Sequence, residues 1–223
     1  SEIEPQILQD ILQFKALIEN KKINQIIEVR SAYNSLLVVY NDFVNGVEDE
    51  LYALKSIYKS NKASNTLKSR LWKIPVCYDA NLGIDLMALA EEKNSSKEAI
   101  IKYHTNPIYT VYFIGFLPGF LYLGGLDETL FTPRKSSPRL KIEKGAVAIG
   151  GNQTGIYPQE SPGGWNIIGN TPINFFDVSK ETPCFANAGD RLQFYSITLK
   201  EHQNIKALIK ANVYQLESEV LDG

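Results

Sequence analysis

The chain has 223 residues, a formal net charge of −2 and a sequence pI of about 5.8. Hydrophobic residues make up 44% of it and charged residues 22%, which is typical of a folded globular protein and argues against disorder. Because no global positive field would attract nucleic acid or an anionic membrane surface, neither is expected as a partner. The longest apolar run, residues 109–126, is broken by glycine and proline and does not predict a membrane-spanning helix.

The first 59 or so residues predict a helix, two strands and a second helix. Apolar residues at 7, 11, 14 and 18 have helical spacing, and Ser1 with Glu4 would form a capping box at the start of this helix. Residues 26–30 and 36–40 are β-rich runs joined by a turn through 33–35, and a second helix follows over 47–59 with Val47, Leu51, Leu54 and Tyr58 on one face. We expect a small α/β sandwich domain, residues 1–65, in which two helices cover the sheet.

Residues 60–70 are polar and lack apolar periodicity, so they predict a linker and a domain boundary. The second domain, residues 70–223, is expected to hold many short strands separated by Gly/Pro turns, which is typical of an antiparallel β-barrel or sandwich. The expected strands are 71–78, 108–116, 145–151, 165–169, 173–178 and 191–197, and the expected helices are 82–93, 95–104 and a closing helix over 202–215.

Residues 150–172, GGNQTGIYPQESPGGWNIIGNTP, combine six glycines and three prolines with a single formal charge, Glu160. Glycine permits positive φ and close backbone approach, whereas proline fixes φ and removes a donor, so this composition predicts a shaped loop. Its polar and aromatic residues, such as Gln153, Tyr157 and Trp165, could line a binding site. The plainer interpretation is that the loop only turns corners between strands and that Trp165 belongs to the core.

Two arginines, Arg134 and Arg139, each directly follow a proline in the run TPRKSSPRLKIEKG. Because the guanidinium fork binds carboxylates bidentately, two arginines on a stiffened backbone could hold an anionic small molecule. The alternative is ordinary surface ion pairing.

The common catalytic motifs are absent: the chain contains no GxxxxGK[ST], GxGxxG, GxSxG or HExxH. Two histidines, His104 and His202, cannot make a His-rich metal site, and no metal or biotin is expected. His104 ends a predicted helix and could simply interact with its C-terminal dipole. Cys77 and Cys184 form no CxxC or Cys/His cluster, which favours reduced, inert core thiols and, with no recognisable signal peptide, a cytoplasmic location.

Taken in order, YTVYFIGFLPGFLYLGGL, PRKSSPR and GAVAIGGNQTGIYPQESPGGWNIIGNTP resemble the KipI/PxpB family, also called allophanate hydrolase subunit 1. The resemblance covers nearly the whole chain from residue 7 onward. It implies an α+β fold in which a small N-terminal domain precedes a cyclophilin-like β-barrel. Members usually open with a strand carrying a Gly-Asp pair, whereas this sequence begins at SEIEP, so the first strand of the N-terminal sheet is expected to be missing.

The resemblance also implies that the 150–172 stretch lines a cleft of the barrel. Within that cleft the arginines would hold a carboxylate, Gln153 and Tyr157 would orient an amide or carbonyl, and His104 would transfer a proton. The expected catalytic residues are His104, Arg134, Arg139, Gln153 and Tyr157; the expected substrate-binding residues are Pro118, Gly119, Gly163, Gly164 and Trp165.

By the same resemblance, the chain would be a subunit of a bacterial ATP-dependent 5-oxoprolinase, which hydrolyses the cyclic amide 5-oxoproline to glutamate. Its partners would be a homologous KipA/PxpC-type barrel subunit and a LamB/YcsF-type subunit, with ATP used by the complex and no ATP site evident in this chain. Two alternatives stay open: a non-catalytic inhibitor of a sensor histidine kinase, and an allophanate or urea-amidolyase type of subunit.

Overall fold

The computed structural model describes residues 4–43, 46–60 and 68–221. Its backbone contacts group into two units that meet in sequence at Ser69 and Arg70. Residues 61–67, the centre of the predicted linker, lie outside the described part of the chain, as does Ser1 of the predicted capping box. In the described residues no helix combines the length and the apolar character needed to cross a membrane.

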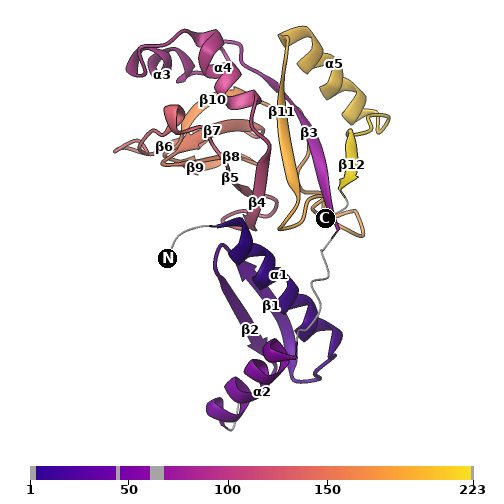
Figure 1. The fold of residues 1–223 in the computed structure, drawn as a ribbon. Helices are drawn as coiled ribbons and strands as arrows, with labels where there is room; N and C mark the ends of the chain where they lie inside the picture. The colour runs from indigo at the N-terminus through magenta and orange to yellow at the C-terminus, as the bar shows by residue number, and fades with distance from the viewer. Residues whose placement is uncertain (1–3, 44–45, 61–67, 222–223) are drawn as a thin grey trace. The chain divides into compact units, whose positions relative to one another are not determined.

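The first unit is a helix, a β-hairpin and a second helix, as its sequence pattern predicts: α1 (Pro5–Asn20), β1 (Ile26–Ala32), β2 (Ser35–Tyr40) and α2 (Val47–Lys59) (Figure 1). The strands pair antiparallel, with Ala32 opposite Ser35 at the hairpin end. The small core of this unit contains Leu8, Ile11, Ile18 and Val29, so α1 and β1 supply it.

The second helix of this unit differs from its expected covering role. None of the α2 residues is buried, and Val47, Leu51 and Tyr58 of its predicted apolar face are exposed. The helix contacts α1 through Tyr58, whose hydroxyl donates to Asp10 Oδ2 at 2.8 Å and whose ring packs edge-on against Phe14. At the start of α1, Glu4 occupies the N-cap position and makes no side-chain capping hydrogen bond. It therefore does not stand at N3, the position that the predicted capping box requires of it.

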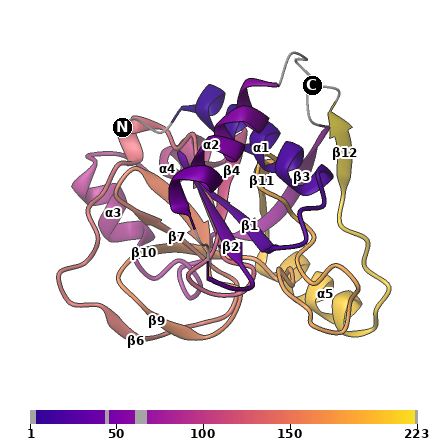
Figure 2. The same cartoon turned by 90° about the horizontal axis from the view of Figure 1, so that it is seen from below.

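The second unit is a closed barrel with helices packed around it (Figures 1 and 2). The strands follow the order β10-β7-β8-β5-β4-β11-β3-β12, and the pairing of Asn170 in β10 with Cys77 in β3 closes the barrel. Its elements are β3 (Ser69–Cys77), α3 (Leu86–Glu92), α4 (Lys97–Thr105), β4 (Tyr109–Ile114), β5 (Leu121–Gly124), the 3-10 helix η1 (Glu128–Leu130), β6 (Arg139–Ile142), β7 (Ala146–Gly150), β8 (Gln153–Ile156), β9 (Ser161–Gly163), β10 (Asn166–Asn170), β11 (Arg191–Ile197), α5 (Leu199–Lys210) and β12 (Ser218–Leu221).

The expected α+β fold with a barrel is confirmed, although the barrel is mixed rather than antiparallel, because β11 runs parallel to β3. Two further differences concern the residues at which predicted helices begin. Helix α3 begins only at Leu86, because turns at residues 79–85 bring Gly83 so close to Ile168 that a Cβ on this glycine would lie 2.3 Å from the Ile168 carbonyl oxygen. Helix α5 begins at Leu199, earlier than expected, because Thr198 and Glu201 form a capping box, and β12 follows it.

The predicted strand over residues 173–178 is wrong. This segment forms no strand, although its apolar residues Ile173 and Phe175 are buried in the main core of the barrel. The alternation of apolar residues that predicted a strand therefore reflects two side chains that attach an irregular segment to the core. Conversely, the Gly/Pro-rich run of 115–126 contains β5, and the run of 150–172 contains β8, β9 and β10.

Candidate functional site

The glycines of residues 150–172 serve close packing of strands against aromatic rings. A Cβ on Gly150 would lie 2.6 Å from the ring of Trp165, and one on Gly163 would lie 2.3 Å from the hydroxyl oxygen of Tyr157. Only Gly151 within this stretch needs a positive φ, of 67°, at the turn between β7 and β8. Most of the glycines in this stretch are thus explained by neighbouring side chains that occupy the space where a Cβ would stand.

These rings form a second, smaller core beside the main one. Phe120 packs edge-on against Tyr157 at 5.4 Å and against Trp165 at 5.7 Å between ring centroids. Tyr157 is 2% exposed and Trp165 is 4% exposed, so the core interpretation of Trp165 holds for most of its surface. Burial raises the pKa of Tyr157, partly offset by a hydrogen bond from the backbone of Trp165, so its phenol stays protonated at neutral pH.

Arg134 lies at the edge of this aromatic cluster. Its guanidinium carbon is 5.6 Å from the centroid of a Trp165 ring, within cation–π range, while the residue itself is exposed. The segment that carries it is bonded to the start of β10 and the residues just before it: the Lys135 N–H donates to the Gly164 carbonyl at 2.7 Å, and Asn166 Nδ2 donates to the Pro133 carbonyl at 3.0 Å. The segments 133–139 and 163–166, which are about 25 residues apart in the chain, therefore lie side by side.

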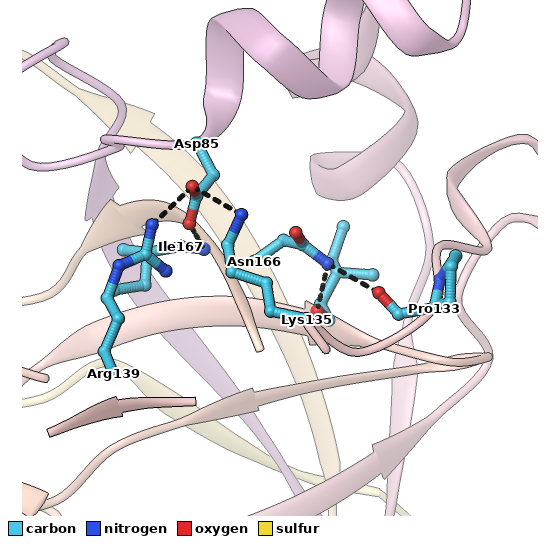
Figure 3. Close-up of polar contacts among 7 residues, drawn as sticks. Asp85, Pro133, Lys135, Arg139, Asn166 and Ile167 are labelled. Carbon is cyan, nitrogen blue, oxygen red and sulfur yellow. Dashed lines mark hydrogen bonds and ion pairs between the residues drawn. The ribbon is translucent and has the colours of Figure 1, made fainter. Parts of the chain in front are cut away.

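Arg139 forms an ion cluster with Asp85 and Lys135, neither of which the sequence pattern predicts as a site residue (Figure 3). Its Nη2 donates to Oδ1 of Asp85 at 2.6 Å, and Lys135 Nζ lies 3.0 Å from the same oxygen. The other carboxylate oxygen, Oδ2, accepts from the Ile167 N–H at 2.7 Å. The strand position of Arg139 is fixed in turn by the pairing of β6 with β9, where it lies opposite Gly163.

Asp85 is the centre of this cluster, and its side chain is only 8% exposed. Burial alone would raise its pKa, but hydrogen bonds from Arg139, from the Ile167 N–H and from Lys135 together lower the pKa below its ordinary value. Asp85 stands at the N-cap position of α3 yet makes no capping hydrogen bond, because its carboxylate turns toward β10 and the two cations instead. Aspartate before a helix usually indicates capping, so the sequence offered no signal for this role.

One nitrogen of Arg139 remains without a partner. Among the contacts of the described residues, its Nη1 is buried and makes no hydrogen bond. A buried donor without an acceptor is costly, so this atom is the unsatisfied polar group of the cluster. The cluster of Lys135, Arg139 and Asp85 carries two cations and one anion, so its net charge is positive, and Arg134 on the same segment adds an exposed cation.

His104 lies apart from this cluster, in the main core, and is 0% exposed. Thr154 donates its hydroxyl hydrogen to the Ala148 carbonyl at 3.1 Å, so it accepts from His104 Nε2 at 2.9 Å, and His104 Nδ1 then accepts from the Tyr78 hydroxyl at 2.7 Å. The imidazole also stacks on Phe194 with 4.5 Å between centroids. Burial lowers the pKa of His104 to about 3, so the ring is neutral at physiological pH.

This arrangement does not match the expected cleft position of His104 or its proton transfer at neutral pH, since a fully buried neutral imidazole is a core hydrogen-bonding group.

The remaining expected residues are spread along the barrel. Gln153 begins β8 opposite Gly150, while Pro118 and Gly119 form the turn between β4 and β5, where Gly119 has a φ of 83° and lies against the backbone of Phe175.

No group of three or more His, Cys, Asp and Glu side chains within the described ranges is arranged to hold a metal ion. Cys77 is buried and Cys184 is partly buried, and both are free thiols whose pKa is raised chiefly by burial.

Comparison with known proteins gives the chain a family. The model of the carboxyltransferase domain, subdomain C and D, matches residues 1–186. A protein of Haemophilus influenzae that is named as a subunit of 5-oxoprolinase is 43% identical over 169 residues, 76% of this chain and 78% of that protein. Its namesake in Bacillus subtilis is 36% identical over 215 residues, 92% of this chain and 90% of that protein. The chain belongs to this carboxyltransferase-domain family and, within it, to the KipI/PxpB group.

Solved structures agree with this membership. TTHA0988 superposes with a TM-score of 0.76 at 32% identity over 88% of this chain, although the chain spans only 38% of that longer protein. The urea amidolyase of K. lactis superposes with a TM-score of 0.79 over 99% of this chain and 15% of its own, and at 18% identity it shows a shared fold alone.

Proposed function

We propose that this chain is one subunit of an ATP-dependent 5-oxoprolinase, which opens the cyclic amide of 5-oxoproline to give glutamate. The observation that supports it most strongly is the 36–43% identity to two proteins named as 5-oxoprolinase subunits, over at least three quarters of each chain. The partners in this proposal are a KipA/PxpC-type barrel subunit and a LamB/YcsF-type subunit.

The ion cluster supplies a chemical role for the subunit within that proposal. 5-Oxoproline carries one carboxylate, and Arg139 has a buried Nη1 with no partner among the described residues. Lys135 shares Asp85 with it, and Arg134 lies on the same segment of the chain. Asp85 holds the guanidinium in place through Nη2, so the free edge of the fork is oriented before a ligand arrives. In this proposal Arg139 is the carboxylate clamp, and Arg134 adds a second, exposed positive charge.

The same cluster supplies no nucleophile and no general base near neutral pH. Asp85 is engaged with two cations and the Ile167 N–H, and Tyr157 and His104 are buried and uncharged. In this proposal the reacting groups belong to the partner subunits, and this chain contributes binding and orientation.

Reconstitution tests the proposal. The purified chain alone should show no ADP release that depends on 5-oxoproline, and the three subunits together should produce glutamate and ADP. Leaving this chain out of the mixture should abolish turnover. Robust turnover by this chain alone, or by the two partners without it, would overturn the assignment. A reconstituted mixture without turnover, together with inhibition of histidine-kinase autophosphorylation by this chain, would establish the regulator instead.

A further inference from the structure

A cavity of about 470 Å³ lies between α5 and the segment that follows β10, away from the cluster around Arg139. It is lined on one side by residues of α5 and on the other by the end of β10 and the turn before β7. The residues important for its chemistry are Lys144, Asn170, Thr171, His202, Lys206 and Lys210.

The polar floor of this cavity is held rigidly. Gly145, with a φ of 83°, brings its turn so close that an added Cβ would lie 2.2 Å from the Thr171 carbonyl oxygen. The Thr171 N–H donates to the Gly145 carbonyl at 2.8 Å, and Asn170 Nδ2 donates to the Lys144 carbonyl at 2.9 Å. The backbone of Lys144 is therefore fixed next to the end of β10.

His202 connects α5 to the same floor. Because the amide nitrogen of Asn170 is used as a donor, its Oδ1 is an acceptor, and it accepts from His202 Nε2 at 2.9 Å. The imidazole is 7% exposed, so this is a buried contact. Lys206 follows His202 by four residues and lies on the same face of the helix, which places its stem at the cavity.

The charge of the lining is one-sided. The lining residues include three lysines, Lys144, Lys206 and Lys210, and no carboxylate. Within the described ranges none of these ammonium groups lies within ion-pair distance of Asp or Glu, and the one interaction with a carboxylate among them is that of Lys144, whose charge helps to lower the pKa of Asp177. Burial, followed by the positive charge of Lys206, lowers the pKa of His202, so Lys206 lies close to the imidazole.

We propose that this cavity is a binding site for a phosphate-bearing small molecule. Three lysines without an arginine provide mobile point charges, which suit the several oxygens of a phosphate more than the planar edge of a carboxylate. The amide of Asn170 bonds to the imidazole of His202 and to the Lys144 carbonyl, so the floor beneath those charges is held in one arrangement. A concave site of this volume fits a small molecule rather than a flat protein surface. The site is separate from the carboxylate clamp, and its existence does not depend on the proposed 5-oxoprolinase role.

Isothermal titration of the full chain with inorganic pyrophosphate at physiological ionic strength tests the site. Wild-type protein should bind one equivalent, and the double variant Lys206→Gln/Lys210→Gln should bind about tenfold more weakly, because two favourable charges are removed. Glutamine keeps the helix propensity of these positions. The matched control is Lys200→Gln, which removes a lysine from the same helix outside the cavity lining and should change the affinity less than about twofold.

Three results would overturn the site: no binding by the wild type, equal losses in the control and the double variant, or citrate binding as tightly as pyrophosphate. The last outcome would mean that only negative charge is recognised. A free phosphate and a nucleotide present the same chemistry, and a parallel titration with ATP separates them. Tighter binding of ATP than of pyrophosphate, weakened by the same double variant, assigns the site to a nucleotide; equal affinity assigns it to the phosphate groups alone.

Discussion

Arg139 and Asp85, which are 54 residues apart in the chain, are joined by a hydrogen bond of 2.6 Å between Nη2 and Oδ1. This contact connects the strand β6 to the turn that precedes α3. Asp85 also connects that turn to β10, because its Oδ2 accepts a hydrogen bond from the Ile167 N–H. The pair is therefore a structural link between three segments as well as the support of the proposed clamp. Any change at Arg139 must be interpreted for stability before it is interpreted for activity.

Removal of this link should destabilise the barrel. Arg139→Ala breaks a hydrogen bond between charged groups of which Asp85 is nearly buried, so the free energy of unfolding should fall by roughly 1–3 kcal/mol in urea titrations. Lys135 remains as a partner of Asp85 and keeps the loss below that of an isolated buried charge. The matched control is Lys141→Ala on the same strand, whose pair with Glu160 is largely exposed and should be worth less than about 1 kcal/mol. Equal effects of the two variants would contradict a structural role for the pair.

The same cluster predicts a pH dependence of stability. The pKa of Asp85 is lower in the folded protein than in the unfolded chain, where it is about 3.9, so the unfolded state takes up the proton first as pH falls. The stabilisation by this carboxylate is complete above the unfolded pKa and is lost as pH falls through the folded pKa. Asp85→Asn should therefore be less stable than the wild type at pH 7, and the difference should shrink below about pH 4. A difference that stays constant from pH 7 to pH 3 would show that charge at Asp85 is not the cause.

The sequence predicted an element correctly where interactions between residues close in the chain determine that element. Helices α1 and α2 and the hairpin between them follow from apolar spacing within a few residues, and they were found where expected. The short strands β6 and β9 have no such period and exist because they pair with each other across about 20 residues. In the candidate site, Arg134 and Arg139 were visible from their prolines, whereas Asp85 became relevant only through folding.

The glycine pair at the end of β9 gives a further prediction from packing alone. A Cβ on Gly163 would lie 2.3 Å from the Tyr157 hydroxyl oxygen and 2.6 Å from Ile142 Cδ1, whereas one on Gly164 would meet nothing closer than 3.5 Å. Gly163→Ala should therefore cost roughly 1–3 kcal/mol of stability through overpacking. Gly164→Ala should change stability by less than about 0.5 kcal/mol, because its contacts are ordinary. Thermal or urea unfolding of both variants measures the difference, and equal stability would contradict the packing of Tyr157 against β9.

His104 should behave as a neutral core group in solution. With its pKa lowered to about 3 by burial, the ring should stay in the Nε2–H form, and its ¹⁵N chemical shifts should not change between pH 8 and pH 5. The unfolded chain takes up a proton near pH 6.5, so this residue contributes full stability above that pH and progressively less as pH falls toward 3. A titration step of His104 between pH 5 and pH 7 would contradict its burial and would restore it as a candidate for proton transfer.

The carboxylate clamp makes the last prediction. In the reconstituted complex, Arg139→Ala should reduce kcat/KM for 5-oxoproline by about tenfold to a few hundredfold, because a hydrogen bond to a charged group is worth roughly 1.5–3 kcal/mol. Arg139→Lys should recover only part of the loss, since an ammonium keeps the charge but cannot contact Asp85 and a substrate carboxylate through two nitrogens of one planar group.

Stability and catalysis are separated by a second variant of the same cluster. Asp85→Asn removes the ionic partner of Arg139 but leaves the guanidinium, so it should lower stability while costing less of kcat/KM than Arg139→Ala does. Assays are run well below the melting temperature of each variant, which thermal melts establish. Wild-type kcat/KM in Arg139→Ala would exclude the clamp, because the buried Nη1 would then bind nothing that the reaction requires. Equal losses in Arg139→Ala and Asp85→Asn would assign the defect to the structural link between β6, β10 and α3 instead.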